Sequence, residues 1–193
     1  MLYAFGKFLC GLLLKVFFRF KVYGLENVPP KGGFILASNH TSYLDPVALG
    51  VASPRALNFM ARHDLFFNPF FSRLISGLGA FAVRPKAADP DALKEAIRRL
   101  RQGAALVVFP EGRRVPKGQE AAPGAGVGFL AQKLSVPVIP ALIKGADTAL
   151  PIGAGFIRPA RISVRFGKQI LVERRTPYED AARHIMSQIR QLS

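Results

Sequence analysis

The organisation of this chain follows from one segment, FILASNHTSYLDP at residues 34–46. The apolar run at residues 34–37 predicts a buried strand, because a short uninterrupted apolar run is typical of a strand covered on both faces. Asp45 and Pro46 predict the N-cap and the first residue of a helix. His40 then lies in the turn between strand and helix, at the carboxyl edge of a sheet, where α/β folds bind their ligands.

Further short apolar runs alternate with helical patterns along the chain. The runs lie at residues 57–61, 80–83, 104–109, 136–143 and 161–166, and the last alternates as a half-exposed strand does. Asp89 predicts the start of a helix that ends at Gly103, and the capping-box pattern from Thr176 to Glu179 predicts the start of another. Residues 119–128 predict a loop rich in Gly, Ala and Pro. We therefore predict an α/β fold with a mixed, largely parallel β-sheet flanked by helices.

The composition is both basic and apolar. The 193 residues include 27 Lys and Arg but only 12 Asp and Glu, a formal net charge of +15, and half of the residues are hydrophobic. The apolar content excludes a disordered chain and suits one domain with a sizeable core. Such a protein needs an anionic partner, either nucleic acid or an anionic membrane surface. The single cysteine, Cys10, excludes an internal disulfide, and no Cys/His cluster has the spacing of metal ligands.

The N-terminal segment, residues 1–21, is the most apolar part of the chain. Basic residues interrupt it, so its apolar run is too short for a membrane-spanning helix of about 20 residues. Lys7, Gly11, Lys15 and Arg19 recur at intervals of four, and a helix would gather them in a narrow cationic stripe beside a wide apolar surface. We expect this helix to lie in the interface of an anionic membrane. The alternative is an ordinary helix packed on the protein's own core.

His40 and Asp45 are candidates for a catalytic pair. A turn can fold Asp45 back onto the His40 imidazole, where the carboxylate fixes the tautomer and leaves the other ring nitrogen as a general base. From the spacing alone a second interpretation stays open, in which His40 is simply hydrogen-bonded within the turn. His63 and His184 are expected to be structural or surface residues.

Arginines are predicted to gather at the same edge of the sheet. The segment FPEGRR at residues 109–114 follows a predicted strand. Gly112 permits close backbone approach, and a guanidinium can donate two parallel hydrogen bonds to a phosphate. Arg62 and Arg84 follow two other predicted strands. If those strands are parallel, Arg62, Arg84 and Arg114 share the edge that carries His40 and form an anion site.

These segments together resemble the glycerolipid acyltransferases, the family of 1-acyl-glycerol-3-phosphate acyltransferases. His40 and Asp45 match the family's H-x4-D signature. Residues 79–84 (GAFAVR) resemble its second block, residues 109–114 its third block, which is usually FPEGTR, and residues 136–140 (VPVIP) its fourth. The similarity covers roughly residues 22–170. It implies the acyltransferase fold, with an acyltransferase domain at residues 22–193 after the N-terminal membrane helix.

The resemblance also implies a reaction. The family transfers a fatty acyl group from acyl-CoA or acyl-carrier protein to the free hydroxyl of lysophosphatidic acid, which forms phosphatidic acid for phospholipid biosynthesis. His40, oriented by Asp45, would take the hydroxyl proton, and the oxygen would attack the thioester directly. No metal, cofactor or acyl-enzyme is then expected, and backbone N–H groups of the turn are candidates for stabilising the oxyanion.

The resemblance further implies which residues hold the acceptor and where the protein acts. The family's phosphate-binding positions correspond here to Arg84, Glu111, Gly112 and Arg114, with Arg62 at a further basic position. We expect a membrane-associated protein, peripheral or monotopic, on the cytoplasmic face.

Arg113 departs from the family pattern, because threonine usually stands at this position. It is a candidate head-group contact and keeps open a different acceptor, such as a lyso-ornithine lipid or a lysophospholipid with a larger head group. A second alternative is a non-enzymatic basic protein that binds a membrane or nucleic acid. The sequence shows neither a recognition helix nor aromatic stacking platforms, so nucleic acid is not expected as a partner.

Overall fold

The computed structural model describes residues 2–84, 89–116 and 118–193, and Met1 of the predicted N-terminal segment lies outside them. The helices are α1 (Leu2–Phe18), α2 (Asp45–Ala52), α3 (Pro69–Gly77), α4 (Pro90–Arg101), α5 (Gly126–Leu134), α6 (Ala146–Ala149) and α7 (Tyr178–Gln191). The strands are β1 (Lys21–Tyr23), β2 (Phe34–Ser38), β3 (Leu57–Arg62), β4 (Ala80–Val83), β5 (Ala105–Val108), β6 (Val138–Lys144) and β7 (Ser163–Phe166). The 3-10 helices are η1 (Leu25–Asn27) and η2 (His63–Phe66).

Within the described residues, seven strands form one sheet in the order β1-β7-β6-β2-β5-β3-β4. Strands β6, β2, β5, β3 and β4 run parallel to one another, whereas β7 pairs antiparallel with β6 and β1 runs parallel to β7. This confirms the predicted α/β fold with a mixed, largely parallel sheet. Because the parallel strands end at the same edge, the segments that follow β2, β3, β4 and β5 share that edge.

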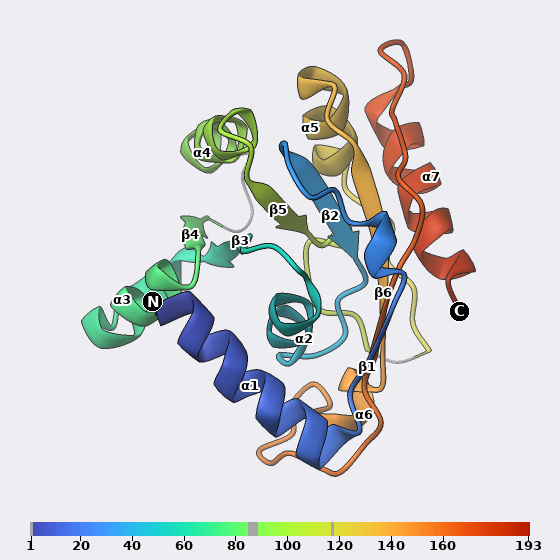
Figure 1. Ribbon diagram of the computed structural model, residues 1–193. Coiled ribbons are helices and arrows are strands. Elements are labelled where there is room, and N and C mark those ends of the chain that lie inside the picture. The colour runs from blue at the N-terminus through green and yellow to red at the C-terminus, as the bar shows by residue number, and fades with distance from the viewer. Residues whose placement is uncertain (1, 85–88, 117) are drawn as a thin grey trace.

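Helices cover both faces of the sheet (Figure 1). Along β2 the side chains alternate between two cores. Phe34 and Leu36 pack in the core that includes residues of α1 and α2, and Ile35 and Ala37 pack in the core that includes residues of α4, α5 and α7. All five residues of β2 are buried. A central parallel strand covered on both faces is apolar throughout, which explains why this run was recognisable in the sequence.

The two predicted helix starts have different outcomes. The start of α4 is confirmed, because the Asp89 carboxylate accepts hydrogen bonds from the N–H groups of Asp91 (3.1 Å) and Ala92 (3.2 Å). The predicted capping box of α7 is wrong: Pro177 occupies the N-cap position, and no side chain caps the helix. Thr176 lies one residue before the N-cap position, and its N–H group donates to the carbonyl of Glu173 in a turn that precedes the helix.

The predicted loop at residues 119–128 is shorter in the structure, because α5 begins at Gly126. Val127 and Gly128 are buried, and a Cβ atom on Gly128 would lie 2.3 Å from the carbonyl oxygen of Tyr178 in α7. Close packing of α5 on α7 therefore overrides the poor helix propensity of glycine. That packing is a long-range contact, which the local sequence pattern does not reveal.

The inner face of α1 packs on the rest of the protein. Leu14 and Phe18 belong to the core that includes residues of α2 and β2. The Lys7 ammonium donates a hydrogen bond to the carbonyl of Ser53 at the end of α2. On this face α1 is an ordinary helix packed on the core. The N-terminal segment and the remaining chain therefore share one hydrophobic core.

The outer face of α1 is exposed and apolar. Its exposed large side chains are Leu2, Phe5, Phe8, Leu9, Leu12, Leu13, Val16 and Phe17. The predicted cationic stripe is wrong in part, because Lys7 bonds to the protein and a Cβ atom on Gly11 would touch the Val51 side chain at 3.5 Å. Lys15 and Arg19 are the exposed members of that stripe. Among the described residues, no helix has the length and hydropathy to cross a membrane.

Candidate active site

His40 and Asp45 form a pair in the turn between β2 and α2. His40 Nδ1 lies 2.9 Å from Asp45 Oδ2, the Asp45 side chain is fully buried, and 18% of the His40 side chain is exposed. A carboxylate oxygen accepts hydrogen bonds, so Nδ1 is the donor in this pair and a lone pair remains on Nε2. The imidazole therefore has the tautomer that a general base acting through Nε2 needs.

Asp45 closes the turn and is not the N-cap that the sequence predicted. Leu44 occupies the N-cap position, and Asp45 is the first residue of α2. Besides the bond from His40, Asp45 Oδ2 accepts hydrogen bonds from the N–H groups of Thr41 (2.6 Å) and Ser42 (2.8 Å). The N-cap prediction is wrong by one position, because the carboxylate turns back onto the preceding residues.

These bonds restrict the backbone donors that the turn can offer to a substrate. The N–H groups of Thr41 and Ser42 are engaged by Asp45. The N–H group of Leu44 donates to Ser42 Oγ (3.2 Å), and that of Asp45 donates to the Ser42 carbonyl (3.3 Å). These four N–H groups already have acceptors, so none of them is free to stabilise an oxyanion.

Two side chains that sequence reasoning missed as site residues anchor the turn to distant backbone. Asn39 pairs with Ile143 on β6: its Oδ1 accepts from the Ile143 N–H group (2.8 Å), and its Nδ2 donates to the Ile143 carbonyl (3.0 Å). Ser42 Oγ donates to the carbonyl of Leu150 (2.8 Å). The only signal in the sequence was their position relative to the H-x4-D motif, since Asn39 directly precedes it and Ser42 lies inside it. Their partners lie 104 and 108 residues further along the chain.

The segment after β5 packs directly on the catalytic turn. The Phe109 ring stacks on the His40 imidazole, with 3.9 Å between ring centroids and an interplanar angle of 14°. The Val115 N–H group donates to the His40 carbonyl (2.7 Å), and the His40 N–H group donates to Glu111 Oε1 (3.4 Å). Residues 109–115 therefore lie against His40, because β2 and β5 are neighbours in the sheet and end at the same edge. Phe109 was missed as a site residue, since its apolar side chain resembles an ordinary strand residue.

Glu111 is a half-buried carboxyl group beside His40. Its Oε2 is buried and has no hydrogen-bond partner among the residues that the structure describes. Burial raises the pKa of Glu111, although hydrogen bonds from its own N–H group and from that of His40 lower it. An ionised Glu111 is therefore a destabilising element of the folded protein at neutral pH.

Replacing Glu111 with glutamine is expected to raise the free energy of unfolding at neutral pH. The folded-state pKa of Glu111 lies above its unfolded value, so the folded protein favours the protonated carboxyl group. The stability that this group contributes is therefore fully present below the ordinary pKa of 4.5 and is lost as the pH rises through the folded pKa. Glutamine keeps an acceptor for the His40 N–H group and removes the titration. Urea unfolding at about pH 4 and about pH 7 should show a gain that shrinks at the lower pH. An equal gain at both pH values would contradict this explanation.

Arg114 is turned toward the catalytic turn. Its guanidinium lies 3.5 Å from the centroid of the Tyr43 ring, and its buried Nη1 has no hydrogen-bond partner in the described part of the chain. A buried guanidinium N–H group is suited to an anionic oxygen, since leaving it unpaired is costly. Gly112 has a φ of 64° with open space around it, and Arg113 is exposed. Of the two adjacent arginines, Arg114 is the one that contacts the turn.

Arg62 ends β3 but is already paired. Its Nη2 and Nε lie 2.6 Å and 3.1 Å from the two carboxylate oxygens of Asp64. Both side chains are exposed, and their pairing raises the pKa of Arg62 and lowers that of Asp64. A phosphate would have to compete with Asp64 for this guanidinium.

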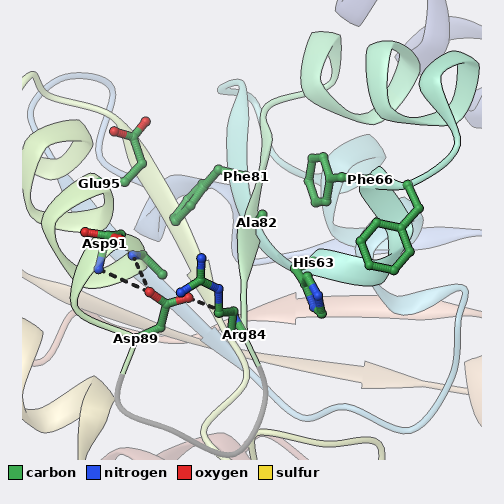
Figure 2. Close-up of a pocket in the computed structure, with 10 residues that line it drawn as sticks. His63, Phe66, Phe81, Ala82, Arg84, Asp89, Asp91 and Glu95 are labelled. Atoms are coloured by element: carbon green, nitrogen blue, oxygen red, sulfur yellow. Dashed lines mark hydrogen bonds between the residues drawn. The ribbon is translucent and has the colours of Figure 1, made fainter.

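Arg84 lies at the edge strand β4, beside a separate pocket (Figure 2). The pocket has a volume of about 460 Å³ and lies between η2 and α4, with Phe66, Phe81 and Asp89 among its lining residues. The Arg84 N–H group donates to Asp89 (2.9 Å). Strands β2 and β4 are separated by β5 and β3, three strand spacings or about 14 Å. Arg84 is thus at the predicted edge, but it follows a strand that is not a neighbour of β2, which precedes the turn that carries His40.

The described part of the chain gathers no three His, Cys, Asp or Glu side chains at which a metal ion could bind. What it does gather is a His/Asp pair, a stacked aromatic ring and an arginine with a buried N–H group lacking an acceptor. This arrangement can deprotonate a hydroxyl group of a substrate that also carries an anionic group.

Comparison with known sequences shows which proteins share these features. The sequence model of the family described as "Acyltransferase" matches residues 19–144. The chain is 31% identical over 144 residues to a 1-acyl-sn-glycerol-3-phosphate acyltransferase of Bacillus subtilis, which covers 72% of this chain and 71% of the relative. It is 30% identical over 162 residues to a protein of the same name from Pseudomonas aeruginosa, which covers 82% of this chain and 62% of the relative.

Comparison with solved structures extends the similarity to almost the whole chain. The crystal structure of the 1-acyl-sn-glycerophosphate (LPA) acyltransferase PlsC from Thermotoga maritima superposes with a TM-score of 0.83 and 26% sequence identity. The superposition covers 99% of this chain and 76% of the Thermotoga protein. The seven-stranded sheet and the helices on both of its faces are therefore shared with that protein.

Proposed function

Because this chain belongs to the acyltransferase family, we propose that it transfers a fatty acyl group to the free hydroxyl of lysophosphatidic acid and forms phosphatidic acid for phospholipid synthesis. The observation that carries this proposal is the His40–Asp45 pair, whose Nδ1–Oδ2 distance is 2.9 Å, with Arg114 of the neighbouring segment packed on Tyr43 of the same turn. The names of the Bacillus, Pseudomonas and Thermotoga proteins support the choice of acceptor. Membership of an enzyme family sets aside the alternative of a non-enzymatic basic protein.

The proposed reaction is a direct acyl transfer. His40 Nε2 takes the proton from the acceptor hydroxyl, and the hydroxyl oxygen attacks the thioester carbonyl carbon. The tetrahedral intermediate collapses, the carbon–sulfur bond breaks, and the leaving thiolate takes the proton back from His40. Asp45 holds the imidazole and stabilises its protonated form between these two steps. The chemistry asks only for a thioester, so acyl-CoA and acyl-carrier protein are both proposed as donors, and no cofactor takes part.

The acceptor's phosphate is proposed to bind beside the turn. The buried Arg114 Nη1 supports this placement, and the open space at Gly112 lets a phosphate approach the backbone. Glu111 would repel a phosphate when ionised, so its proposed role is to hold residues 109–115 against His40 through the bond to the His40 N–H group. Arg62 and Arg84 are proposed to attract the phosphate from further along the same edge of the sheet.

The protein is proposed to act as a peripheral or monotopic protein on the cytoplasmic face of an anionic membrane. The exposed apolar face of α1, with Lys15 and Arg19 at its C-terminal end, supports this placement. The lysolipid acceptor and the phosphatidic acid product both reside in such a membrane. A basic surface that is also apolar suits lipid better than nucleic acid.

The reaction is tested by release of free thiol from a long-chain acyl-CoA when lysophosphatidic acid is added. The same assay with acyl-carrier protein as donor distinguishes the two proposed donors. Thiol release that depends on lysophosphatidic acid supports the proposal, and thiol release with another lysolipid but not with lysophosphatidic acid would overturn the proposed acceptor.

A different acceptor is the second candidate, because Arg113 is exposed next to Arg114 and stands where the family usually has threonine. An additional cation at this position favours a more anionic or larger head group, and a lyso-ornithine lipid or another lysophospholipid belongs in the acceptor panel. With lysophosphatidic acid alone, Arg113 has no assigned partner.

Charge reversal separates the two arginines. Replacing Arg114 with glutamate is expected to raise the KM for lysophosphatidic acid about 10- to 100-fold, because a charge-assisted hydrogen bond to the phosphate is lost. The matched variant Arg113→Glu is expected to change this KM by less. A larger effect of Arg113→Glu, read from initial rates over a range of acceptor concentrations, would reverse the assignment.

A further inference from the structure

Three segments of the chain expose large apolar side chains. The outer face of α1 carries eight of them. The second set is Phe67, Phe70, Phe71 and Leu74, on α3 and just before it. The third set is Ile152, Phe156 and Ile157, on the loop between α6 and β7. Exposed apolar groups of this number need an explanation if they are contiguous, since soluble monomers rarely expose large apolar patches.

The three segments are neighbours in space. At the N-terminal end of α1, Leu2 packs so closely on Gly77 of α3 that a Cβ atom on this glycine would come within 2.6 Å of the leucine. At the C-terminal end, the Ile162 N–H group donates to the Phe18 carbonyl (2.9 Å), which places the end of the loop beside α1. Figure 1 shows α3, α1 and this loop in a row along one side of the molecule. The three segments that carry the exposed apolar side chains therefore lie along one side of the molecule.

The charges on this surface have one sign. Residues 2–23, 65–83 and 148–162 contain no Asp or Glu. The exposed basic residues in these segments include Lys15, Arg19, Arg73, Arg158 and Arg161. Apolar side chains surrounded by cations match the interface of an anionic leaflet, which has hydrocarbon below and phosphates around it. A second copy of the chain would bring cations against cations, so lipid is the better occupant.

The loop between α6 and β7 is held at its base and presents its apolar residues. The Arg158 N–H group donates to the Ala149 carbonyl (2.7 Å), which closes residues 150–157 into a compact loop. The Arg158 guanidinium lies 5.1 Å from the centroid of the Phe156 ring. An aromatic ring next to a cation suits the boundary between hydrocarbon and head groups.

We propose that α1, α3 and the loop at residues 150–158 form one surface that docks the protein on an anionic lipid leaflet. This inference rests on the proposed membrane partner and extends the contact from one helix to three segments. Ser42 Oγ donates to the carbonyl of Leu150, so the loop is tied to the turn that carries His40. Docking of the loop therefore places the catalytic turn at a defined position relative to the head groups.

Single tryptophans test the surface segment by segment, because the chain contains no tryptophan of its own. The variants are Phe8→Trp in α1, Phe70→Trp in α3 and Phe156→Trp in the loop, at residues that are 73%, 87% and 65% exposed. Leu171→Trp is the matched control, since Leu171 is 66% exposed. It follows Ile170, which pairs with Val138 at the start of β6, whereas the loop of Phe156 comes after the other end of this strand. Emission is recorded on phosphatidylglycerol vesicles with and without brominated acyl chains.

The expected result is a shift to shorter wavelength and loss of most emission on brominated vesicles at positions 8, 70 and 156, with position 171 unchanged. If emission is quenched at position 8 but stays unquenched at position 70, at position 156 or at both, the three-segment surface is overturned. If both stay unquenched, α1 alone remains as the membrane helix. Loss at position 171 as well would show unspecific insertion and overturn it too. A dimer in size-exclusion chromatography, with emission at short wavelength before vesicles are added, would assign the surface to a second copy.

Acyl transfer in detergent micelles, measured on the same variants, separates the docking inference from the proposed function. Thiol release that depends on lysophosphatidic acid, together with no quenching at positions 70 and 156, would overturn the docking surface alone. Absence of thiol release in every variant and in the parent chain would instead overturn the proposed reaction.

Discussion

Replacing His40 with alanine is expected to lower kcat about 10²- to 10⁴-fold and to leave the KM for lysophosphatidic acid largely unchanged. The buried Asp45 carboxylate holds the imidazole in place, and the imidazole is proposed to act on the proton and not on the phosphate. The effect should therefore appear in the chemical step, measured as thiol release at saturating acceptor. Circular dichroism and thermal unfolding check that the variant is folded.

His184→Ala is the matched control for this experiment. His184 is exposed on α7 and belongs to neither the turn nor the segment after β5, so its loss should leave kcat unchanged. Turnover within tenfold of the parent in His40→Ala would exclude His40 as the general base. A rise in KM with unchanged kcat would instead place His40 in acceptor binding.

Replacing Asp45 with asparagine is expected to lower kcat by a similar factor, about 10²- to 10⁴-fold, with a small change in stability. The asparagine oxygen can still accept hydrogen bonds from Thr41 and Ser42, so the turn keeps its shape. The variant lacks the negative charge that stabilises the protonated His40. Asp45→Ala should lose the same activity and also lower the free energy of unfolding by about 3 kcal/mol, because the buried N–H group of Ser42 and the partly buried one of Thr41 lose their acceptor.

The comparison of the two Asp45 variants separates charge from architecture. Thiol release reports on the role of the Asp45 charge in the reaction, and urea unfolding reports on the role of Asp45 in holding the turn. If Asp45→Asn keeps the parent's kcat while Asp45→Ala loses it, Asp45 acts by holding the turn, and its charge has no part in the reaction. If both variants keep the parent's kcat, the His40–Asp45 pair is not the catalytic device.

The parts of the fold that were predictable from the sequence depend on local signals. The buried run at residues 34–37 became β2, and Asp89 caps α4 as its position before Pro90 predicts. The alternation of buried and exposed side chains predicted for residues 161–166 is also confirmed, since Ile162, Val164 and Phe166 are buried. Periodicity and capping chemistry act within a few residues, so they can be recognised without knowledge of the fold.

The features that were not predictable depend on contacts between distant residues. Lys7 was assigned to a membrane-facing stripe, but the carbonyl of Ser53 at the end of α2 lies within reach of its ammonium. Thr176 has the sequence of a capping box, yet its N–H group closes a turn one residue ahead of the helix. Neither outcome can be read from the segment itself, because both depend on where other elements pack.

The candidate site shows the same division. The pairing of His40 with Asp45 follows from a short turn and was foreseeable from their spacing. The stacking of Phe109 on His40 requires β5 to lie next to β2, and the bond from Ser42 to Leu150 requires the loop after α6 to reach the turn. The shared edge of Arg62, Arg84 and Arg114 was foreseeable too, but strand order decides that Arg114, which follows β5 next to β2, stacks on Tyr43.

Direct acyl transfer is tested most directly by rapid-quench measurement of thiol release from a long-chain acyl-CoA. The protein is mixed with the donor first without acceptor and then with lysophosphatidic acid. Transfer with His40 as general base predicts no thiol before the acceptor is added, and afterwards one thiol for each phosphatidic acid formed. A burst of thiol stoichiometric with the protein in the absence of acceptor would show an acyl-enzyme and contradict direct transfer.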